Sequence, residues 1–376
     1  MSHHPPQVHG LSGNLTTPDW PALTLGEVQQ VLALRPHCGL PASILWHSPR
    51  PLSAAALVQC AHGRLFIKRH HRRVRSARTL GEEHAFALHL RARGIPMPEI
   101  LAEHAGGTVT VLGDWVYEVQ APIAGDDLYR DRLSWEPMIE PSHAHAAGAM
   151  LARLHQAAVN FDVPQRGTHV LVARSELIRA ADPVAALAAQ LPQRPTLADY
   201  LRDKDWPAQL RHAMSPWHAR VQANLTDVPE LWTHGDWHGS NLAWQLADDA
   251  PRIAAVFDFG LCARNFALFD LATAIERNAV AWLQRGDDRA RPDIAHALID
   301  GYRTQCPLSS AELELLAHLL PIVHVDFAVS EVEYYHAITG SRANADLAWF
   351  EFLQGHAAWF SSHAGRRMLD AIASAP

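Results

Sequence analysis

Cysteine is scarce in this chain of 376 residues, and the four that occur are scattered at positions 38, 60, 262 and 306. No C-x-x-C pair is present, which argues against a zinc site and against a disulfide framework. Free thiols fit a reducing compartment. The N-terminus lacks the basic and apolar regions of a signal peptide, and no uninterrupted apolar run is long enough to span a bilayer. We therefore expect a cytoplasmic protein without a membrane partner.

Basic residues are fewer than acidic ones, and the formal net charge is -7 at pH 7. A general nucleic-acid binder needs a basic surface, so nucleic acid is not an expected partner. Hydrophobic residues make up 48% and charged residues 19% of the chain, a composition typical of a globular protein. At this length we expect two lobes or domains.

Lysine is the rarest basic residue, since only Lys68 and Lys204 occur among 32 Lys and Arg residues. Lys68 lies in the strand-like run Leu-Phe-Ile-Lys-Arg, after a His-Gly turn. A compact ammonium on a flexible stem can sit between two phosphates where a planar guanidinium does not fit. We interpret Lys68 as functional, and Lys204, between two aspartates, as a surface residue.

Two linked motifs dominate the second half of the chain. The pattern H-G-D-x-x-x-x-N runs from His234 to Asn241, and D-F-G begins at Asp258. Phosphoryl transfer needs one carboxylate to orient the attacking hydroxyl, and a second carboxylate and an amide to hold the metal on the phosphates. Asp236, Asn241 and Asp258 supply that set, in that order. A polar turn that merely contains acids is the alternative, and two motifs beside strand-like runs argue against it.

The first third of the chain predicts a strand-rich lobe. Thr24, with Glu27 three residues later, is a helix-starting pattern for residues 24–35. Strands are expected at 43–47, 54–60, 64–69, 98–103, 108–112 and 115–120, with a helix at 79–93. The loop at 49–55 contains no glycine, although a hairpin over a nucleotide often does; Ser53 is left to offer a hydroxyl or an amide.

Helical patterns fill the remainder. An amphipathic helix is expected at 142–159, with His155 as a hydrogen-bonded core histidine, followed by helices over 170–225 and 290–374. Short strands are expected at 241–245 and 253–257, and Asp270 should open a helix. The predicted organisation is α+β, with a flexible tail (1–22), a small strand-rich N-lobe (23–120), a hinge (121–125) and a larger helical C-lobe (126–376).

Over about residues 40–340 the chain resembles the aminoglycoside phosphotransferase and choline kinase-like family, a small-molecule branch of the protein-kinase fold. The resemblance rests on the two motifs and on Phe-Asp-Leu-Ala at 269–272. It implies a bilobal kinase-like enzyme that uses ATP and Mg²⁺. It implies that Asp236 is the catalytic base, that Asn241 and Asp258 are magnesium ligands, and that Lys68 contacts the phosphates with Glu83 as its helix partner.

Further roles follow from the same resemblance. Gln120 and Ala121 fall where the family offers backbone groups to adenine. Asp270 resembles an aspartate that braces the catalytic loop, and His234 is expected to brace it too. The role of His238 stays open between a loop contact and a substrate contact.

Two departures from protein kinases favour a small-molecule acceptor with a hydroxyl group. Gly235 stands where protein kinases usually carry arginine, and the stretch from Gly260 to Asp270 is too short for a long activation segment. Two rival hypotheses remain: a Ser/Thr protein kinase of the same fold, and a non-catalytic nucleotide-binding scaffold.

The acceptor site is expected between the catalytic loop and the helices of residues 160–225 and 320–360. Acids and aromatics in the latter could hold an amine or a quaternary ammonium. They are Asp326, Glu331, Glu333, Tyr334, Tyr335, Trp349 and Glu351. A solvated acidic helix face is the alternative. Residues 269–282 also resemble homoserine kinases of this family. ATP against GTP preference and oligomeric state are left open.

Overall fold

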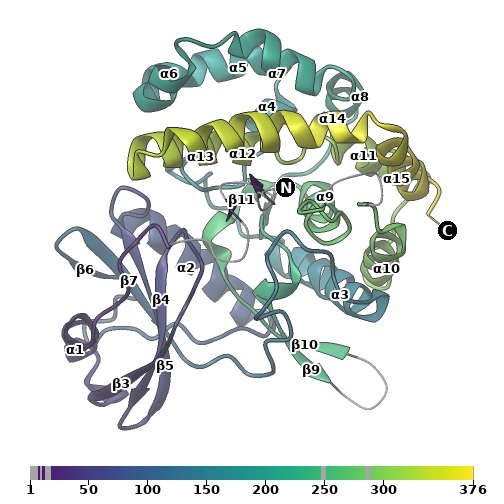
Figure 1. The fold of residues 1–376 in the computed structure, drawn as a ribbon. Helices are drawn as coiled ribbons and strands as arrows, with labels where there is room; N and C mark the ends of the chain where they lie inside the picture. The colour runs from purple at the N-terminus through teal and green to yellow at the C-terminus, as the bar shows by residue number, and fades with distance from the viewer. Residues whose placement is uncertain (1–6, 9–10, 13–17, 247–250, 285–288, 376) are drawn as a thin grey trace, which may run out of the picture.

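The computed structural model describes residues 7–8, 11–12, 18–246, 251–284 and 289–375. Its chain forms two lobes, a smaller one built on a twisted sheet and a larger helical one (Figure 1). The predicted α+β bilobal fold is confirmed. Most of the predicted tail, at residues 1–6, 9–10 and 13–17, lies outside the described residues, and β1 (Gln7–Val8) and β2 (Leu11–Ser12) form a short pair within it.

The smaller lobe contains a five-stranded antiparallel sheet in the order β3-β4-β5-β7-β6. Apolar residues alternate along its strands and pack under α1 (Leu25–Ala33), where the predicted capping box of Thr24 and Glu27 is formed. The strands are β3 (Pro41–His47), β4 (Ala54–Cys60), β5 (Gly63–His71), β6 (Thr110–Leu112) and β7 (Trp115–Gln120), with η1 (Pro36–Cys38) before them. The strand expected at 98–103 is wrong, because this segment makes only an isolated bridge between Ile100 and Gln120.

Helix α2 (Ala77–Ala92) belongs to the smaller lobe by sequence but packs its apolar face toward the larger one. Phe86 and Leu90 are fully buried and join the large helical core instead of the sheet core. This packing couples α2 to the helical lobe by removing apolar surface from water.

The larger lobe is helical apart from two short antiparallel strand pairs. The prolines at 183, 195 and 207, which interrupt the helical pattern in sequence, lie in the first turns of helices, where proline is well tolerated. Its helices are α3 (Pro141–Ala158), α4 (Glu176–Arg179), α5 (Pro183–Gln190), η2 (Leu191–Gln193), α6 (Pro195–Leu201), α7 (Trp206–Met214), α8 (His218–Ala223), α9 (Ala267–Asn278), α10 (Pro292–Arg303), α11 (Ser310–Leu319), α12 (Val325–Glu333), η5 (Tyr334–Thr339), α13 (Arg342–Asp346), η6 (Leu347–Gly355), α14 (His356–Phe360) and α15 (His363–Ala373).

The two strand pairs flank the two motifs. Strand β8 (Leu231–Thr233) pairs with β11 (Ala263–Asn265), and β9 (Leu242–Leu246) pairs with β10 (Pro251–Val256). The loop at 234–241, which ends in η3 (Gly239–Asn241), therefore starts and ends beside the strands that flank Asp258 and η4 (Phe259–Leu261). Short antiparallel pairing thus brings segments about twenty residues apart to one place.

Helices α3 and α10 cross at unusually close range. A Cβ atom added at Gly148 would lie 2.1 Å from the Leu298 carbonyl oxygen, and one added at Gly301 would lie 2.0 Å from the carbonyl oxygen of His145. Each helix therefore needs its glycine for close backbone approach and not for turn conformation. His155, on α3, is buried and contacts Tyr302 and Asp270, which confirms it as a hydrogen-bonded core histidine.

Residues 18–22 bridge the lobes. Trp20 stacks on His71 and meets Trp115 edge-on in the smaller lobe. One residue earlier, Asp19 Oδ2 accepts a hydrogen bond of 2.9 Å from the hydroxyl of Tyr334 in the larger lobe. This short segment, which we call the bridging segment, thus touches both sides of the cleft between the lobes.

One helical run of the larger lobe, Ser310–Thr339, is long and apolar enough to cross a membrane, contrary to the expectation from sequence. The fold buries 94% of its most apolar window. Such burial is typical of a core helix, so the run is weak grounds for a membrane span.

Candidate active site

An open cleft of about 1110 Å³ lies between the lobes. The loop before β4, strand β5, the loop at 234–241 and helices α9 and α12 contribute to its walls. Its lining includes Arg50, Ser53, Lys68, Trp135, Asp236, His238, Asn241, Asp258, Arg277, Phe327, Glu331 and Tyr335. The three residues of the predicted phosphoryl-transfer set thus face one cleft.

Asp236 is surrounded by groups that favour its ionised form. Its Oδ2 lies 3.4 Å from His238 Nε2 and its Oδ1 lies 3.5 Å from a terminal nitrogen of Arg277. Burial alone would raise the pKa of Asp236, but His238 and Arg277 outweigh burial and hold the pKa well below its usual value. Asp236 is therefore an anion at neutral pH, able to accept a proton.

His234 and Gly235 set the backbone of the loop. His234 is fully buried; its Nδ1 accepts from the Asp236 backbone N–H and its Nε2 lies 3.1 Å from the Phe257 carbonyl oxygen. Gly235 has φ of +77°, and an added Cβ would lie 2.7 Å from the carbonyl oxygen of Leu261. A side chain, arginine included, does not fit at this position.

Helix α9 holds the loop through two buried side chains. Asp270 accepts hydrogen bonds of 2.8 Å from the backbone N–H groups of both His234 and Gly235. Two turns later, Asn278 accepts from the N–H of Gly239 and donates to the carbonyl of Trp237. One rigid helix therefore fixes both ends of the loop on which Asp236 stands.

Lys68 and Asp258 form an ion pair across the cleft, with 2.8 Å between Nζ and Oδ1. Burial would lower the pKa of Lys68, but Asp258 and Glu118 outweigh it and keep the lysine charged. Asp258 has a left-handed backbone with φ of 60°, which costs free energy in a non-glycine residue. Such a conformation is often found at functional sites, where the surrounding structure enforces it.

The side chains of Asn241 and Asp258 fit a hard cation. Asn241 Nδ2 donates to the backbone and side-chain oxygens of Asp236, at 2.9 and 3.1 Å. The nitrogen is thus engaged and the amide oxygen is left as a ligand. Asp258 exposes 39% of its side chain to the cleft. An amide oxygen and a carboxylate are ligand types that Mg²⁺ accepts.

These features match a known family. The sequence model of the phosphotransferase enzyme family matches residues 53–308. The chain belongs to this family. The predicted recognition and the predicted enzyme class, a kinase-type phosphotransferase, are confirmed.

Individual members give the same result. The homoserine kinase of Methylobacillus flagellatus is 24% identical over 305 residues, which cover 76% of this chain and 84% of the relative. A microcompartment-associated aminopropanol kinase superposes with a TM-score of 0.65 at 16% identity, over 94% of this chain and 100% of the other. An amicoumacin kinase in complex with AMP-PNP and Ca²⁺ has a TM-score of 0.59 at 15% identity, over 89% and 93%. At such identities the structural matches show a shared fold.

The expected pair between Lys68 and Glu83 is not formed in this phosphotransferase. Glu83 is buried between two arginines, Arg75 and Arg166, the latter 2.6 Å away. Arg75 also donates to the carbonyl oxygen of Gly260, at 2.7 Å. Glu83 thereby ties α2 to the segment after Asp258, and no sequence pattern indicated two competing arginines.

The other residues that were expected to contact the nucleotide lie in different places. Ser53 lines the cleft, and its contact with the nucleotide stays a prediction. Gln120 and Ala121 are not among the lining residues; the Gln120 amide nitrogen donates to Glu118, and the Ala121 backbone N–H donates to the Glu99 carbonyl at 2.8 Å. The backbone N–H of Ala121 is therefore already engaged within the fold.

Three lining arginines, Arg50, Arg75 and Arg277, were missed from sequence. Arg50 joins the lobes by donating to Ser134 Oγ and to the carbonyl oxygen of Arg132, at 3.0 and 3.1 Å. Arg277 lies seven residues after Asp270, which places both on one face of α9. That spacing could have revealed Arg277, whereas Arg50, in a proline-rich loop, had no such signal.

The acids of residues 326–351 are mostly buried, so the solvated-face alternative is wrong for three of them. Asp326 accepts from the backbone N–H of Leu177, and Glu333 pairs with Arg194. Glu331 lines the cleft, and Glu351 alone is exposed. His238, left open from sequence, contacts Asp236 and also lines the cleft.

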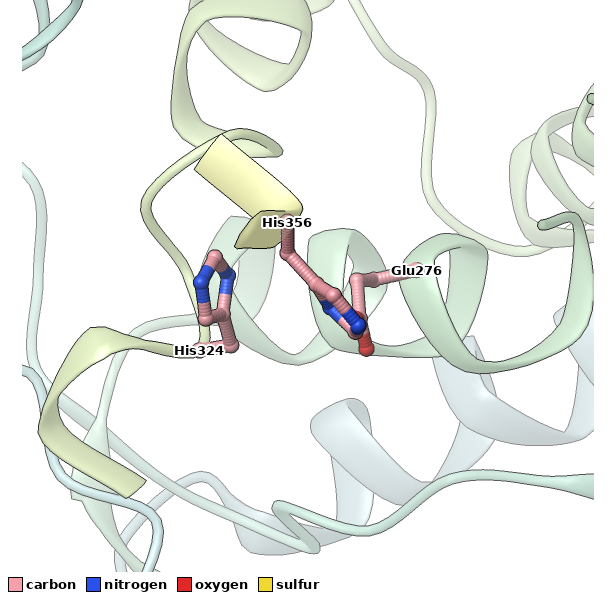
Figure 2. Close-up of side chains that lie close together, drawn as sticks. All are labelled: Glu276, His324 and His356. Carbon is pink, nitrogen blue, oxygen red and sulfur yellow. The ribbon is translucent and has the colours of Figure 1, made fainter. Parts of the chain in front are cut away.

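Behind Arg277 lies a buried cluster of Glu276, His324 and His356, whose ligand atoms all lie within 4.8 Å of one another (Figure 2). Zinc accepts such a set. However, His356 Nδ1 lies 2.8 Å from Glu276 Oε1, the distance of a hydrogen bond. Burial raises the pKa of Glu276 and lowers the pKa of His356 well below its usual value. We interpret the contact as a hydrogen bond between a neutral His356 imidazole and Glu276 that helps to hold α9.

Proposed function

We propose that this chain is an ATP- and Mg²⁺-dependent phosphotransferase that moves the γ-phosphoryl group to a hydroxyl of a small molecule. One observation carries the proposal. An ionised aspartate, Asp236, faces the same cleft as the Lys68–Asp258 pair and Asn241. Phosphoryl transfer relies on positioning and charge stabilisation, and these groups supply both.

In the proposed reaction Asp236 orients the acceptor hydroxyl and accepts its proton as the new oxygen–phosphorus bond forms. The bond between the γ-phosphorus and the bridging oxygen breaks, and ADP leaves with the electron pair. A carboxylate with a lowered pKa suits this role, because the proton transfers late and the main task is orientation. His238 and Arg277 hold the carboxylate in place.

Asn241 and Asp258 are the proposed metal ligands, and a bound Mg²⁺ would neutralise charge on the phosphates. Lys68 is proposed to contact the phosphates, and Ser53 to cover them from the loop before β4. Gln120 and Ala121 are proposed to border the adenine. The structurally similar amicoumacin kinase is a complex with AMP-PNP and Ca²⁺, which supports nucleotide use together with a divalent cation.

A small-molecule acceptor is supported by the short connection between Gly260 and α9. It consists of η4, β11 and one residue before the helix begins at Ala267, and its residues are almost all buried. Such a segment offers no exposed groove for a polypeptide. The names of the relatives, homoserine kinase and aminopropanol kinase, agree with a small hydroxyl compound. We propose action in the cytoplasm, without nucleic acid or membrane, which the four free cysteines support.

The test is ADP release from Mg-ATP with a library of small hydroxyl compounds. Asp236→Asn is expected to lower kcat by about 10²–10⁴, the usual contribution of a positioned base, with an unchanged melting temperature. Asp203→Asn, on an exposed residue, is the matched control and should keep full activity.

Each rival hypothesis has its own outcome. Transfer of label from ATP to lysate proteins, with none to small molecules, would establish a protein kinase instead. Stabilisation by Mg-ATP without turnover of any acceptor would establish a scaffold. An Asp236→Asn variant as active as the wild type would refute the assignment of the base.

A further inference from the structure

Glu331 is an acid without a partner in the wall of the cleft. Its side chain, on α12, is only 3% exposed. Its Oε2 is buried and makes no hydrogen bond. The cleft it lines also contains Asp236, whose charge acts on it. A buried polar atom is normally satisfied, so this one needs an explanation.

The neighbouring acids on the same helix show what a satisfied carboxylate looks like here. Asp326 accepts two contacts of 3.2 Å from the backbone N–H of Leu177, and Glu333 is paired with Arg194 at 2.8 Å. Neither needs anything from outside the fold. Of these three acids, Glu331 alone has a buried oxygen without a donor, and it is the one that lines the cleft.

The nearest cation does not meet this need. Arg277 shares its guanidinium between Asp236, at 3.5 Å, and Glu276, at 3.8 Å, and lies 3.7 Å above the ring of Trp135. No ion pair within 4.0 Å joins Glu331 to any basic residue of the described part of the chain. Burying a carboxylate without a counter-charge is costly, so the empty site favours the protonated acid, and an ammonium group from outside would stabilise the carboxylate in its place.

The walls around Glu331 suit an organic cation. Trp135, Phe327 and Tyr335 line the same cleft, and all three are largely buried. Aromatic faces attract an ammonium group through their electron-rich rings, and their apolar surface accepts its carbon chain. A carboxylate among aromatic rings is thus a site for an amine more than for a neutral polyol.

We propose that Glu331 binds the ammonium group of the acceptor, so that the substrate of this cleft is a small amino alcohol. The inference rests on the proposed function. Glu331 anchors the amine at one end of the acceptor while Asp236 receives the hydroxyl at the other. Selection occurs because a deamino analogue offers the buried acid no charged partner, whereas an ammonium group does. Glu331 is a specificity residue and takes no part in the chemical step.

The experiment is a calorimetric titration of the full chain with Mg-AMP-PNP, in which matched ligands differ only in the amino group. The first pair is 3-aminopropan-1-ol and propan-1-ol; the second is homoserine and 4-hydroxybutanoate. In the wild type we expect at least one amine to bind about 10- to 100-fold more tightly than its deamino partner, the range for a charge-assisted hydrogen bond. Glu331→Gln should remove this preference, and Glu351→Gln, on an exposed acid of η6, should keep it.

Two results would overturn the inference: no amine binds better than its deamino partner, or the preference survives in Glu331→Gln. Stabilisation by Mg-ATP, measured alongside, shows whether each variant is folded and binds nucleotide. Failure of amine selection with intact ATP turnover refutes the role of Glu331 alone. Amine selection without any ATP turnover refutes the phosphotransferase proposal and leaves the amine site standing.

Discussion

Glu331→Gln should make the protein more stable, by an amount that grows as the pH rises. Burial raises the pKa of Glu331 to about 8, from 4.5, with Arg277 only partly opposing the rise. Between these values the folded state keeps the proton and the unfolded state loses it. The free energy of unfolding therefore falls as pH rises through this window, and the loss is complete above the folded pKa. Glutamine does not titrate and escapes this loss.

The magnitude follows from the size of the shift. At about 1.4 kcal/mol per pKa unit, the loss is on the order of 3–5 kcal/mol at pH 9 and close to zero at pH 4.5. For a chain of this length, with about 2.1 cal/mol/K of unfolding entropy per residue, 1 kcal/mol moves the melting temperature by roughly 1.3 °C. The variant should thus melt about 4–6 °C above the wild type at pH 9.

The assay is thermal unfolding from pH 4.5 to 9 in amine-free buffers, because an amine would occupy the proposed site. Only the difference between variant and wild type is used, since other buried acids such as Asp326 titrate in both proteins. Glu351→Gln is the control and should give a flat difference. A difference for Glu331→Gln that does not grow with pH would refute the reasoning.

Three further outcomes are expected. Lys68→Met should lower kcat/KM for ATP by about 10²–10³-fold in a coupled assay, the effect of losing one charge-stabilising donor, whereas Lys204→Met should match the wild type. Asn278→Ala removes two buried hydrogen bonds to the catalytic loop; it should cost about 1–3 kcal/mol in denaturant unfolding and lower kcat more than it changes KM. Gly148→Ala should lower stability by about 1–3 kcal/mol or more because the new methyl group meets the facing helix. Gly81→Ala, in a helix position with open space, should be neutral or stabilising.

The loop at 234–241 was predictable because its signals are local. His234, Asp236 and Asn241 lie within eight residues, and the left-handed backbone at Gly235 requires a residue type that can be seen in sequence. Asp270 also matched, because its position at the start of a helix fixes its reach to the loop.

The partners of Glu83 could not be predicted in the same way. Arg166 lies 83 residues from Glu83 in sequence. Only tertiary packing decides that Glu83 pairs with Arg166 and not with Lys68. Glu331 could not be singled out from the other candidate acids either. Its helix carries several acids, and periodicity cannot tell a solvated acid from one turned into a cleft. Which partner an acidic side chain pairs with depends on the charges around it in three dimensions, and helical spacing does not encode these charges.

The bridging segment fastens the two lobes to each other. Trp20 is held by the rings of the sheet lobe, while Asp19 is held by Tyr334 of the helical lobe. Any motion that parts the lobes must therefore release this hydrogen bond. Tyr334 lies one turn of helix after Glu331. On the proposal that Glu331 binds the acceptor, the acceptor site and this contact between the lobes share one stretch of helix.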